Sequence, residues 1–469
     1  MSGDRLLEQQ AEKNRKKGCG CALTLALLAL VLIGVPVVAY LMFSMRASRL
    51  VEAELAAIRA AGEPATADEL NDYYECPPAE KDSTKFWLAA VKILDPDDPQ
   101  YTEDCGELPI VGDIDEEKII PPPGQAWGDL EAVEEFLAKY ADSLGLLHRA
   151  AEKGGAARYP VDFSEGLVVM DISHMEGMRE ANRVLSLQAH VRAHREDARG
   201  AAESIHTLFM LAHSLRNEPA TIPQLFRMLH FGRACELIRD LLPYVEFSDA
   251  DLASFRANIQ DVDLDSAIER TMIGERALVG SMFRDPESFD DFDVPVISHL
   301  GFLGARDDEL LLYLKHMNDY VAASRQPWPR RLDDAEALDK EIEALMDSAI
   351  NRFRYALTRE IAGYGANFTK AFARNEATLR STDAAVAVEQ FRRKNGRLPE
   401  KLDELVPEFL EKVPLDPFDG QPLRYVVQED EYKIYSVGEN RVDDGGKVAD
   451  SEYQFQDPDL VVTVKRVEK

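Results

Sequence analysis

An uncharged apolar stretch near the start of the chain, Cys21–Ser44, most constrains what this protein can fold into. A helix rises about 1.5 Å per residue, so about 20 apolar residues cross the roughly 30 Å hydrocarbon core of a bilayer. The stretch is long enough to do so, and it exceeds the roughly 7–15 apolar residues of a signal peptide. We therefore predict a single N-terminal transmembrane helix over residues 21–44 that is retained as an anchor in the lipid bilayer.

The charges that flank this stretch predict its orientation. Lys13, Arg15, Lys16 and Lys17 lie immediately before it, and basic residues favour the cytoplasmic side of a membrane. Residues 1–20 are therefore expected to form a basic cytoplasmic tail. Everything after the span is expected on the extracytoplasmic side.

The rest of the chain is large and strongly acidic. The protein has 469 residues, too many for one ordinary core, and its formal net charge is −31. An acidic body repels the phosphates of nucleic acids, so a nucleic-acid partner is not expected. The apolar content of 45% predicts a packed body, and its excess of acidic residues indicates either solubility at high concentration or cation binding at an acidic loop.

Helical spacing of apolar residues dominates residues 45–365. Met178–His194 and Ala198–Leu215, for example, are expected to form two antiparallel helices. One proline-rich stretch, Asp95–Ala126, is expected to be a long loop. The sequence thus predicts a mostly α protein with a large all-α extracytoplasmic body.

Two histidines on one predicted helix, His190 and His194, have the i, i+4 spacing that zinc ligands use. The catalytic H-E-x-x-H pattern needs a glutamate at the second position, where this chain has Val191. His206 and His213 follow on the next helix and are the residues that could face the pair. The alternative is that the histidines are ordinary partly buried side chains.

Glu269 and Glu275 lie on an otherwise apolar predicted helix. A buried carboxylate can act as a tuned acid or base. It can equally be paired with Arg270, Arg276 or an arginine elsewhere, and pairing is the expected state because an unpaired buried charge is costly.

The cysteines bear on whether the body lies in an oxidising compartment, where disulfides form. Cys76 and Cys105 lie in the loop-rich part of the exported body, where they form either a disulfide or two free thiols. Cys235 lies among apolar residues on a helix and is expected to be a buried thiol.

The pattern changes in residues 366–469. A long helix is expected to end at Gly396, and the Tyr- and Val-rich runs Leu423–Gln428 and Tyr432–Val437 indicate an antiparallel hairpin. A last short strand is expected over Leu460–Val464. The sequence here predicts a small α+β domain with an antiparallel sheet.

Seven short segments of this region occur in an order that is similar to the C-terminal domain of the major pseudopilin of type II secretion systems. They are Gln390–Pro399, Leu402–Leu405, Val413–Pro417, Tyr425, Tyr435–Gly438, the acidic loop Asp443–Gly446 and Asp459–Val462. The resemblance covers about residues 370–465. It implies a long helix laid against a small antiparallel sheet.

In that family the acidic loop can hold calcium, which prefers six to eight oxygen ligands. The resemblance implies Asp443, Asp444 and Asp459 as ligands, and the residues themselves suggest Asn440 as a further one. The alternative is a solvated loop at the end of a hairpin, because paired aspartates beside glycines are also common turn residues.

The chain departs from the family in its N-terminal part. The apolar run contains no glutamate, which the family uses in subunit assembly, and no processing motif precedes it. We therefore expect a permanent anchor in the bacterial inner membrane, not a fibre subunit. The expected function is a non-enzymatic interaction or scaffold role near a type II secretion or pilus-like system. The alternative is a membrane-tethered, metal-dependent enzyme with its site in the helical body.

Overall fold

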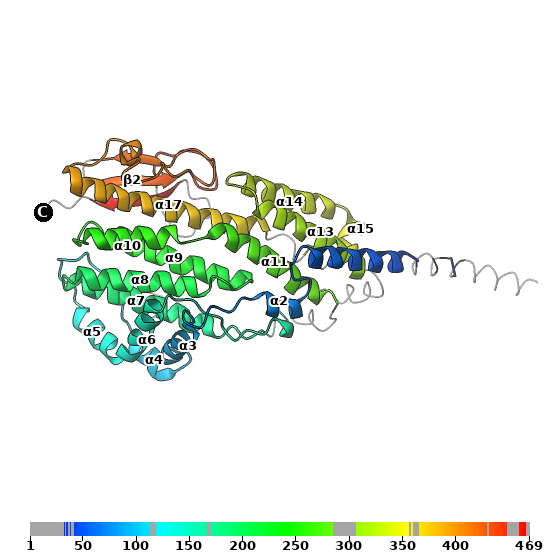
Figure 1. Ribbon diagram of the computed structural model, residues 1–469, viewed down its shortest axis with the longest axis horizontal. Coiled ribbons are helices and arrows are strands. Elements are labelled where there is room, and N and C mark those ends of the chain that lie inside the picture. Colours follow the sequence, from blue (N-terminus) through cyan, green and yellow to red (C-terminus); the bar gives the residue numbers. More distant parts are fainter. Residues whose placement is uncertain are drawn as a thin grey trace, which may run out of the picture.

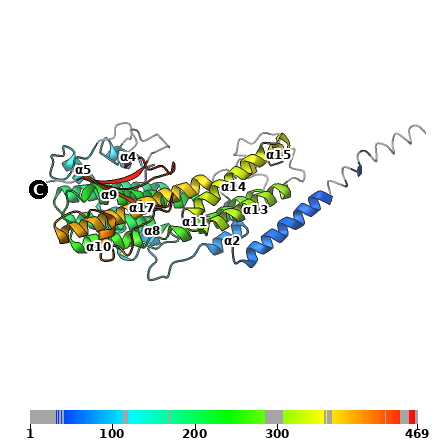
Figure 2. The same ribbon diagram turned by 90° about the horizontal axis from the view of Figure 1, so that it is seen from above.

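A computed structural model describes residues 32, 34–35, 38, 42–112, 119–166, 170–284, 306–355, 358–359, 365–428, 431–447 and 459–465. The protein is mostly helical, with one small three-stranded antiparallel sheet. The described part is elongated, and residues 42–60 form a helix that leaves it at one long end (Figure 1, Figure 2).

The predicted cytoplasmic tail and most of the predicted span lie outside the described residues. Within the part that the structure describes, no helix is both long and apolar enough to cross a bilayer.

The helical body follows the predicted periodicity in most places. Its elements in chain order are α2 (Ala67–Tyr73), α3 (Thr84–Ile93), α4 (Pro99–Cys105), α5 (Leu130–Lys139), α6 (Ala141–Glu152), the short 3₁₀ helix η1 (Phe163–Glu165), α7 (His174–His194), α8 (Ala198–Ser214), α9 (Thr221–Leu241), α10 (Asp249–Gln260), α11 (Leu264–Met282), α13 (Arg306–Ser324), α14 (Arg330–Met346) and α15 (Ala349–Arg354).

The expected long loop Asp95–Ala126 is wrong in one respect, because it contains α4. Asp98 caps this helix by accepting a hydrogen bond from the Gln100 N–H, and Pro99 occupies its first turn. Both are favourable at a helix start, so the prolines that indicated a loop also mark a helix N-terminus.

The predicted pair of antiparallel helices is confirmed as α7 and α8, which pack along their lengths. The turn between them places Glu196 at φ 59°, in the left-handed region. Figure 1 shows the resulting layers: α7–α10 run through the middle, α3–α6 cover one side, and the sheet with its long helix covers the other.

The C-terminal region consists of α17 (Gly365–Asn395), the short 3₁₀ helix η4 (Leu402–Leu405) and the strands β1 (Arg424–Val427), β2 (Glu431–Ser436) and β3 (Leu460–Lys465). The strand order is β1-β2-β3, and both pairs are antiparallel, with Ile434 opposite Tyr425 and Val462. Gly396 ends α17 at φ 71°, as predicted. The expected hairpin and last strand are thus confirmed.

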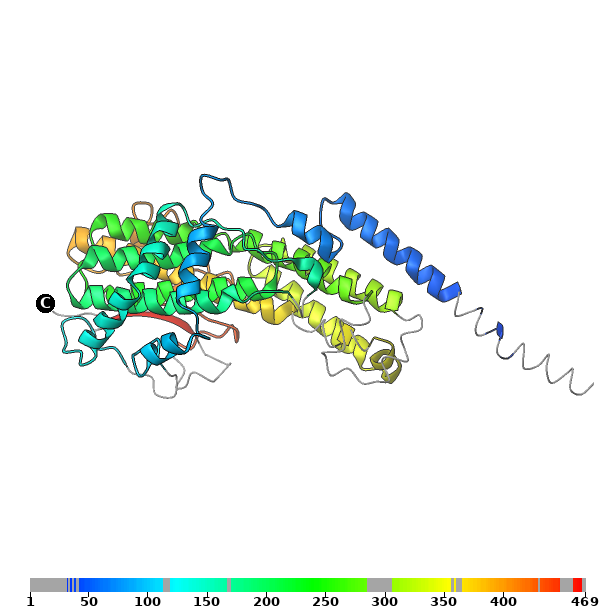
Figure 3. The same cartoon turned by 90° about the horizontal axis from the view of Figure 1, so that it is seen from below.

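One helix, α17, carries the contact between the body and the sheet. Its residues Ala384–Val388 are all fully buried, because α9 and α10 pack on one side and β2 and β3 on the other. A helix that is apolar all round is buried all round. Figure 3 shows β3 lying beside the central helices from below.

The main hydrophobic core runs without a break from Val51 to Val464. It crosses the predicted boundary between residues 45–365 and residues 366–469. Because α17 contributes to packing on both sides, the body and the C-terminal region share one core.

Candidate functional site

The four predicted calcium ligands lie together at the loop that follows β2. Asp459 accepts hydrogen bonds from the backbone N–H of Gly446 (2.8 Å) and of Asp444 (3.4 Å). Asn440 donates a side-chain hydrogen bond of 3.0 Å to Asp444. These bonds tie the loop to the residue that begins the last strand, so the structure brings together the residues that the resemblance implied.

Asp459 is the least exposed member of this group, at 4%. Burial raises the pKa of its carboxyl, the two backbone N–H groups of Gly446 and Asp444 oppose that shift, and the nearby charges of Asp443 and Asp444 raise the pKa further. Two carboxylates whose charges raise the pKa of a third favour a cation beside it.

A cation is already present beside Asp443. Arg424 Nε on β1 lies 3.8 Å from its carboxylate, and the Tyr435 hydroxyl donates to it at 3.1 Å. Burial, and next the hydrogen bond to Asp443, raise the pKa of Tyr435 to about 12. Arg424 therefore competes with any metal for Asp443.

Arg424 also reaches Asp416, a fully buried carboxylate to which the sequence analysis gave no role. Asp416 accepts hydrogen bonds from Arg424 (2.9 Å), from the backbone N–H groups of Phe418 (2.9 Å) and Val437 (2.8 Å), and from the Ser436 hydroxyl (2.8 Å). These contacts fasten the segment before β1 to the end of β2. An aspartate in the apolar run Val413–Phe418 was the available signal.

No group of three or more His, Cys, Asp or Glu side chains arranged for a metal ion occurs among the described residues. This neither supports nor opposes calcium at the loop, where backbone carbonyls and Asn440 would also be ligands.

His190 and His194 lie near the C-terminal end of α7, and different protein groups surround each of them. His194 Nε2 is 2.9 Å from the Pro121 carbonyl oxygen, and its ring lies 5.0 Å from that of Trp127. Burial, and next the charge of Arg233, lower the pKa of His190 to about 4. The contacts of His194 agree with the alternative that these are ordinary packed histidines.

His206 and His213 contact α10 and not the first pair. His206 Nδ1 is 3.1 Å from the Asn258 side-chain oxygen, and His213 Nε2 is 3.7 Å from Asp261. Burial lowers the pKa of His213. The two histidines on α8 therefore do not complete a site with those on α7.

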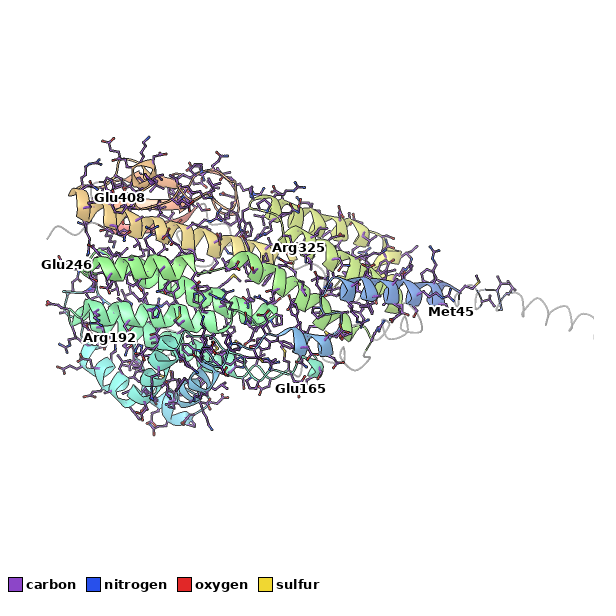
Figure 4. The ribbon with its side chains drawn as sticks, viewed as in Figure 1. Met45, Glu165, Arg192, Glu246, Arg325 and Glu408 are labelled. Atoms are coloured by element: carbon purple, nitrogen blue, oxygen red, sulfur yellow. The ribbon has the colours of Figure 1, made fainter. Side chains whose placement is uncertain are left out.

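The two glutamates of α11 are both held by hydrogen bonds. Glu269 pairs with Arg325 at 2.7 Å, as expected for an arginine elsewhere in the chain; Figure 4 labels that arginine. Glu275 is different, because the backbone N–H of Thr221 donates to it at 2.7 Å. Burial raises the pKa of the Glu275 carboxyl, whereas the hydrogen bond from Thr221 lowers it. Thr221 begins α9, and the N-terminus of a helix attracts negative charge.

A buried carboxylate–imidazole pair was missed by the sequence analysis. Glu218 is 1% exposed, neither of its carboxylate oxygens accepts a hydrogen bond, and His174 Nε2 lies 3.5 Å away. The ring of Tyr159 stacks on the imidazole at 4.4 Å. Glu218 lies between α8 and α9 in a segment without periodicity, so nothing in the sequence marked this pair.

Of the two alternatives for Cys76 and Cys105, the structure shows two free thiols. Cys76 is an exposed free thiol and Cys105 is a buried one. Burial raises the pKa of the Cys105 thiol to about 11, against the hydrogen bond with Tyr101. Cys235 is a buried free thiol, as predicted.

Comparison with known proteins adds no family to these observations. No family model matches the chain, and no curated protein or solved structure matches it either.

Proposed function

We propose that this chain is a membrane-anchored bacterial envelope protein that binds other envelope proteins near a type II secretion or pilus-like system. Residues 21–44 serve as the anchor, the N-terminus is cytoplasmic, and the acidic body lies outside the inner membrane. The apolar run and the basic residues before it support this orientation.

A row of exposed apolar side chains on α9 carries the proposal. Ile222, Leu225 and Leu229 follow one another at helical spacing and are 39%, 42% and 53% exposed. Residues three and four apart lie on the same face of a helix, and a continuous exposed apolar face is typical of a protein-binding surface. The row lies beside α17, since Asn375 on that helix donates to the Met228 carbonyl.

The C-terminal region supports the choice of system. The resemblance implies a long helix against a small antiparallel sheet, and α17 packs on β2 and β3. The Tyr432 hydroxyl on β2 lies 3.0 Å from Glu389 on α17, which fixes one element on the other. A pseudopilin-like domain at the end of an anchored chain is suited to contact the proteins of such an apparatus.

Calcium at the acidic loop is part of the same proposal. The grouping of Asp443, Asp444 and Asp459, together with the raised pKa of Asp459, supports a cation there. Bound calcium would stabilise the loop between β2 and β3.

Crosslinking in intact membranes, followed by recovery of the full chain, tests the function. The wild-type chain is expected to recover secretion-type components, and the variant with Leu225→Asp and Leu229→Asp is expected to lose them. Ile93→Asp is the matched control, because Ile93 is 38% exposed on α3 and lies outside the row. Recovery of no such component by the wild type, or equal recovery by both variants, would contradict the proposal.

A further inference from the structure

The short helix α15 lies at the end of the molecule from which the helix over residues 42–60 projects (Figure 1, Figure 2). The guanidinium of Arg354 on α15 sits 5.1 Å from the ring centroid of Phe43. Phe43 belongs to the last residues of the predicted span. A side chain that reaches Phe43 therefore lies at the depth where the span meets the membrane surface.

The helix over residues 42–60 is fixed to the body, so this relation is part of the fold. Arg284 on the turn after α11 pairs with Glu52 at 2.6 Å, and Asn318 on α13 donates to Glu54 at 2.7 Å. Just beyond the helix, Glu63 accepts from Arg276 at 2.7 Å with both side chains largely buried. These contacts fix the helix on α11 and α13, and the contact between Arg354 and Phe43 relates it to α15.

Several strongly exposed apolar side chains lie at this end of the molecule. Ile350 on α15 is 76% exposed, and Met42 and Met45 are 65% and 54% exposed. Apolar side chains this exposed at the end of a predicted span suit the boundary between headgroups and acyl chains.

The charges at this end of the molecule also favour contact with a membrane surface. Residues 42–50 and 347–359 contain five arginines and one acidic residue, Asp347, in a chain of net charge −31. The nearby Asp308 is paired with Arg354 at 2.6 Å. Arginines beside a membrane surface bind phosphate and lay their apolar stems along lipid.

We infer that α15 is a second membrane contact, which lies in the headgroup layer and binds anionic phospholipid through Ile350 and the surrounding arginines. The inference rests on the proposed anchor. It goes beyond it, because it assigns a lipid-binding surface to a segment about 300 residues further along the chain. Two contacts with the membrane would fix the tilt of the whole body.

Photocrosslinking of the full chain in nanodiscs that contain phosphatidylglycerol tests the inference. Benzoylphenylalanine replaces Ile350 in one sample and Ile119 in the control. Ile119 is 90% exposed, and it lies near Pro121, which contacts His194 at the end of α7. Arg192, in that last turn of α7, lies at the opposite end of the molecule from Met45 in Figure 4. A lipid adduct, measured by intact mass, is expected at position 350 and not at position 119.

The outcomes separate the contact from the anchor. A chain that enters nanodiscs but gives no lipid adduct at position 350 overturns the inference and leaves the anchor standing. A chain that does not enter nanodiscs overturns both. Arg352→Glu is expected to lower the adduct yield at position 350. An unchanged yield would show that α15 does not recognise the anionic headgroup.

Discussion

Several buried histidines of the body lie where only the neutral imidazole is favoured. His230 on α9 is fully buried, its Nδ1 is 2.8 Å from the Asn182 side chain, and burial lowers its pKa to about 3. His190 shows the same direction on α7. Such residues stabilise the fold only while they remain unprotonated, so they link folding to pH.

The stability of the protein is expected to fall as pH drops below about 6.5, the pKa of an unfolded histidine. Between that pH and about 3, His230 binds a proton in the unfolded state but not in the folded one. The free energy of unfolding therefore decreases by about 1.4 kcal/mol per pH unit for this residue. Urea unfolding at pH 7 and pH 5 measures this, and His230→Phe should give a shallower dependence on pH. An equal dependence in both chains would contradict the assignment.

Calcium binding at the acidic loop would appear as a gain in stability. Added calcium is expected to raise the melting temperature, because a ligand at about 100 times its Kd adds about 2.7 kcal/mol. The variant with Asp443→Ala and Asp444→Ala should lose this response. Glu341→Ala with Glu343→Ala is the control, since both residues are exposed on α14. A response that survives in the loop variant would place calcium elsewhere.

At the scale of elements, the sequence predicted most helices because their apolar residues recur at helical spacing and their ends carry caps. Ser248 and Asp251, for example, form the capping box of α10. The break at Tyr140 between α5 and α6 was not predicted, since the apolar spacing continues across it. Candidate sites were predicted only where their residues are close in sequence, as at Asp443 and Asp444. Asp416 and Glu218 gain their surroundings from distant segments, which periodicity does not reveal.

A largely buried ion pair contributes to the contact between α10 and α17. Arg256 donates two hydrogen bonds to Asp383, of 2.8 and 3.2 Å, and the two side chains are 15% and 12% exposed. Asp383→Ala leaves a largely buried guanidinium unpaired, so the free energy of unfolding should fall by about 3 kcal/mol. Arg393→Ala is the matched control on the same helices, since its pair with Asp249 is 3.5 Å long and exposed. That variant should cost less than about 1 kcal/mol.

Chemical denaturation with a double-mutant cycle measures the first pair. The variant with Arg256→Met and Asp383→Leu should recover part of the loss, because no buried charge is left unpaired. Strictly additive effects of the two single changes would show that the pair does not couple α10 to α17.

At the scale of the whole molecule, the net charge and the hydrophobic core have different effects on the fold. The net charge of −31 sets the long-range electrostatic field of the molecule, but it does not define the fold. The fold depends on a core that continues from the first helix to the last strand. The resemblance concerned only the C-terminal region, yet α17 is buried by the body as much as by the sheet. The C-terminal region is thus not free to move independently of the body.

Because the core is shared, the body and the C-terminal region should unfold together. Trp87 on α3 is fully buried on one side of the molecule. Trp328 lies before α14 and packs against a cluster that contains Phe418 and Val437 of the C-terminal region. Variants that retain one of these tryptophans, with the others changed to phenylalanine, report each side by fluorescence. Equal midpoints are expected, because coincident transitions from different probes indicate one cooperative unit. Two separate midpoints would show that residues 366–469 fold as an independent domain, and a fixed tilt of the whole body above the membrane would then no longer follow from α15.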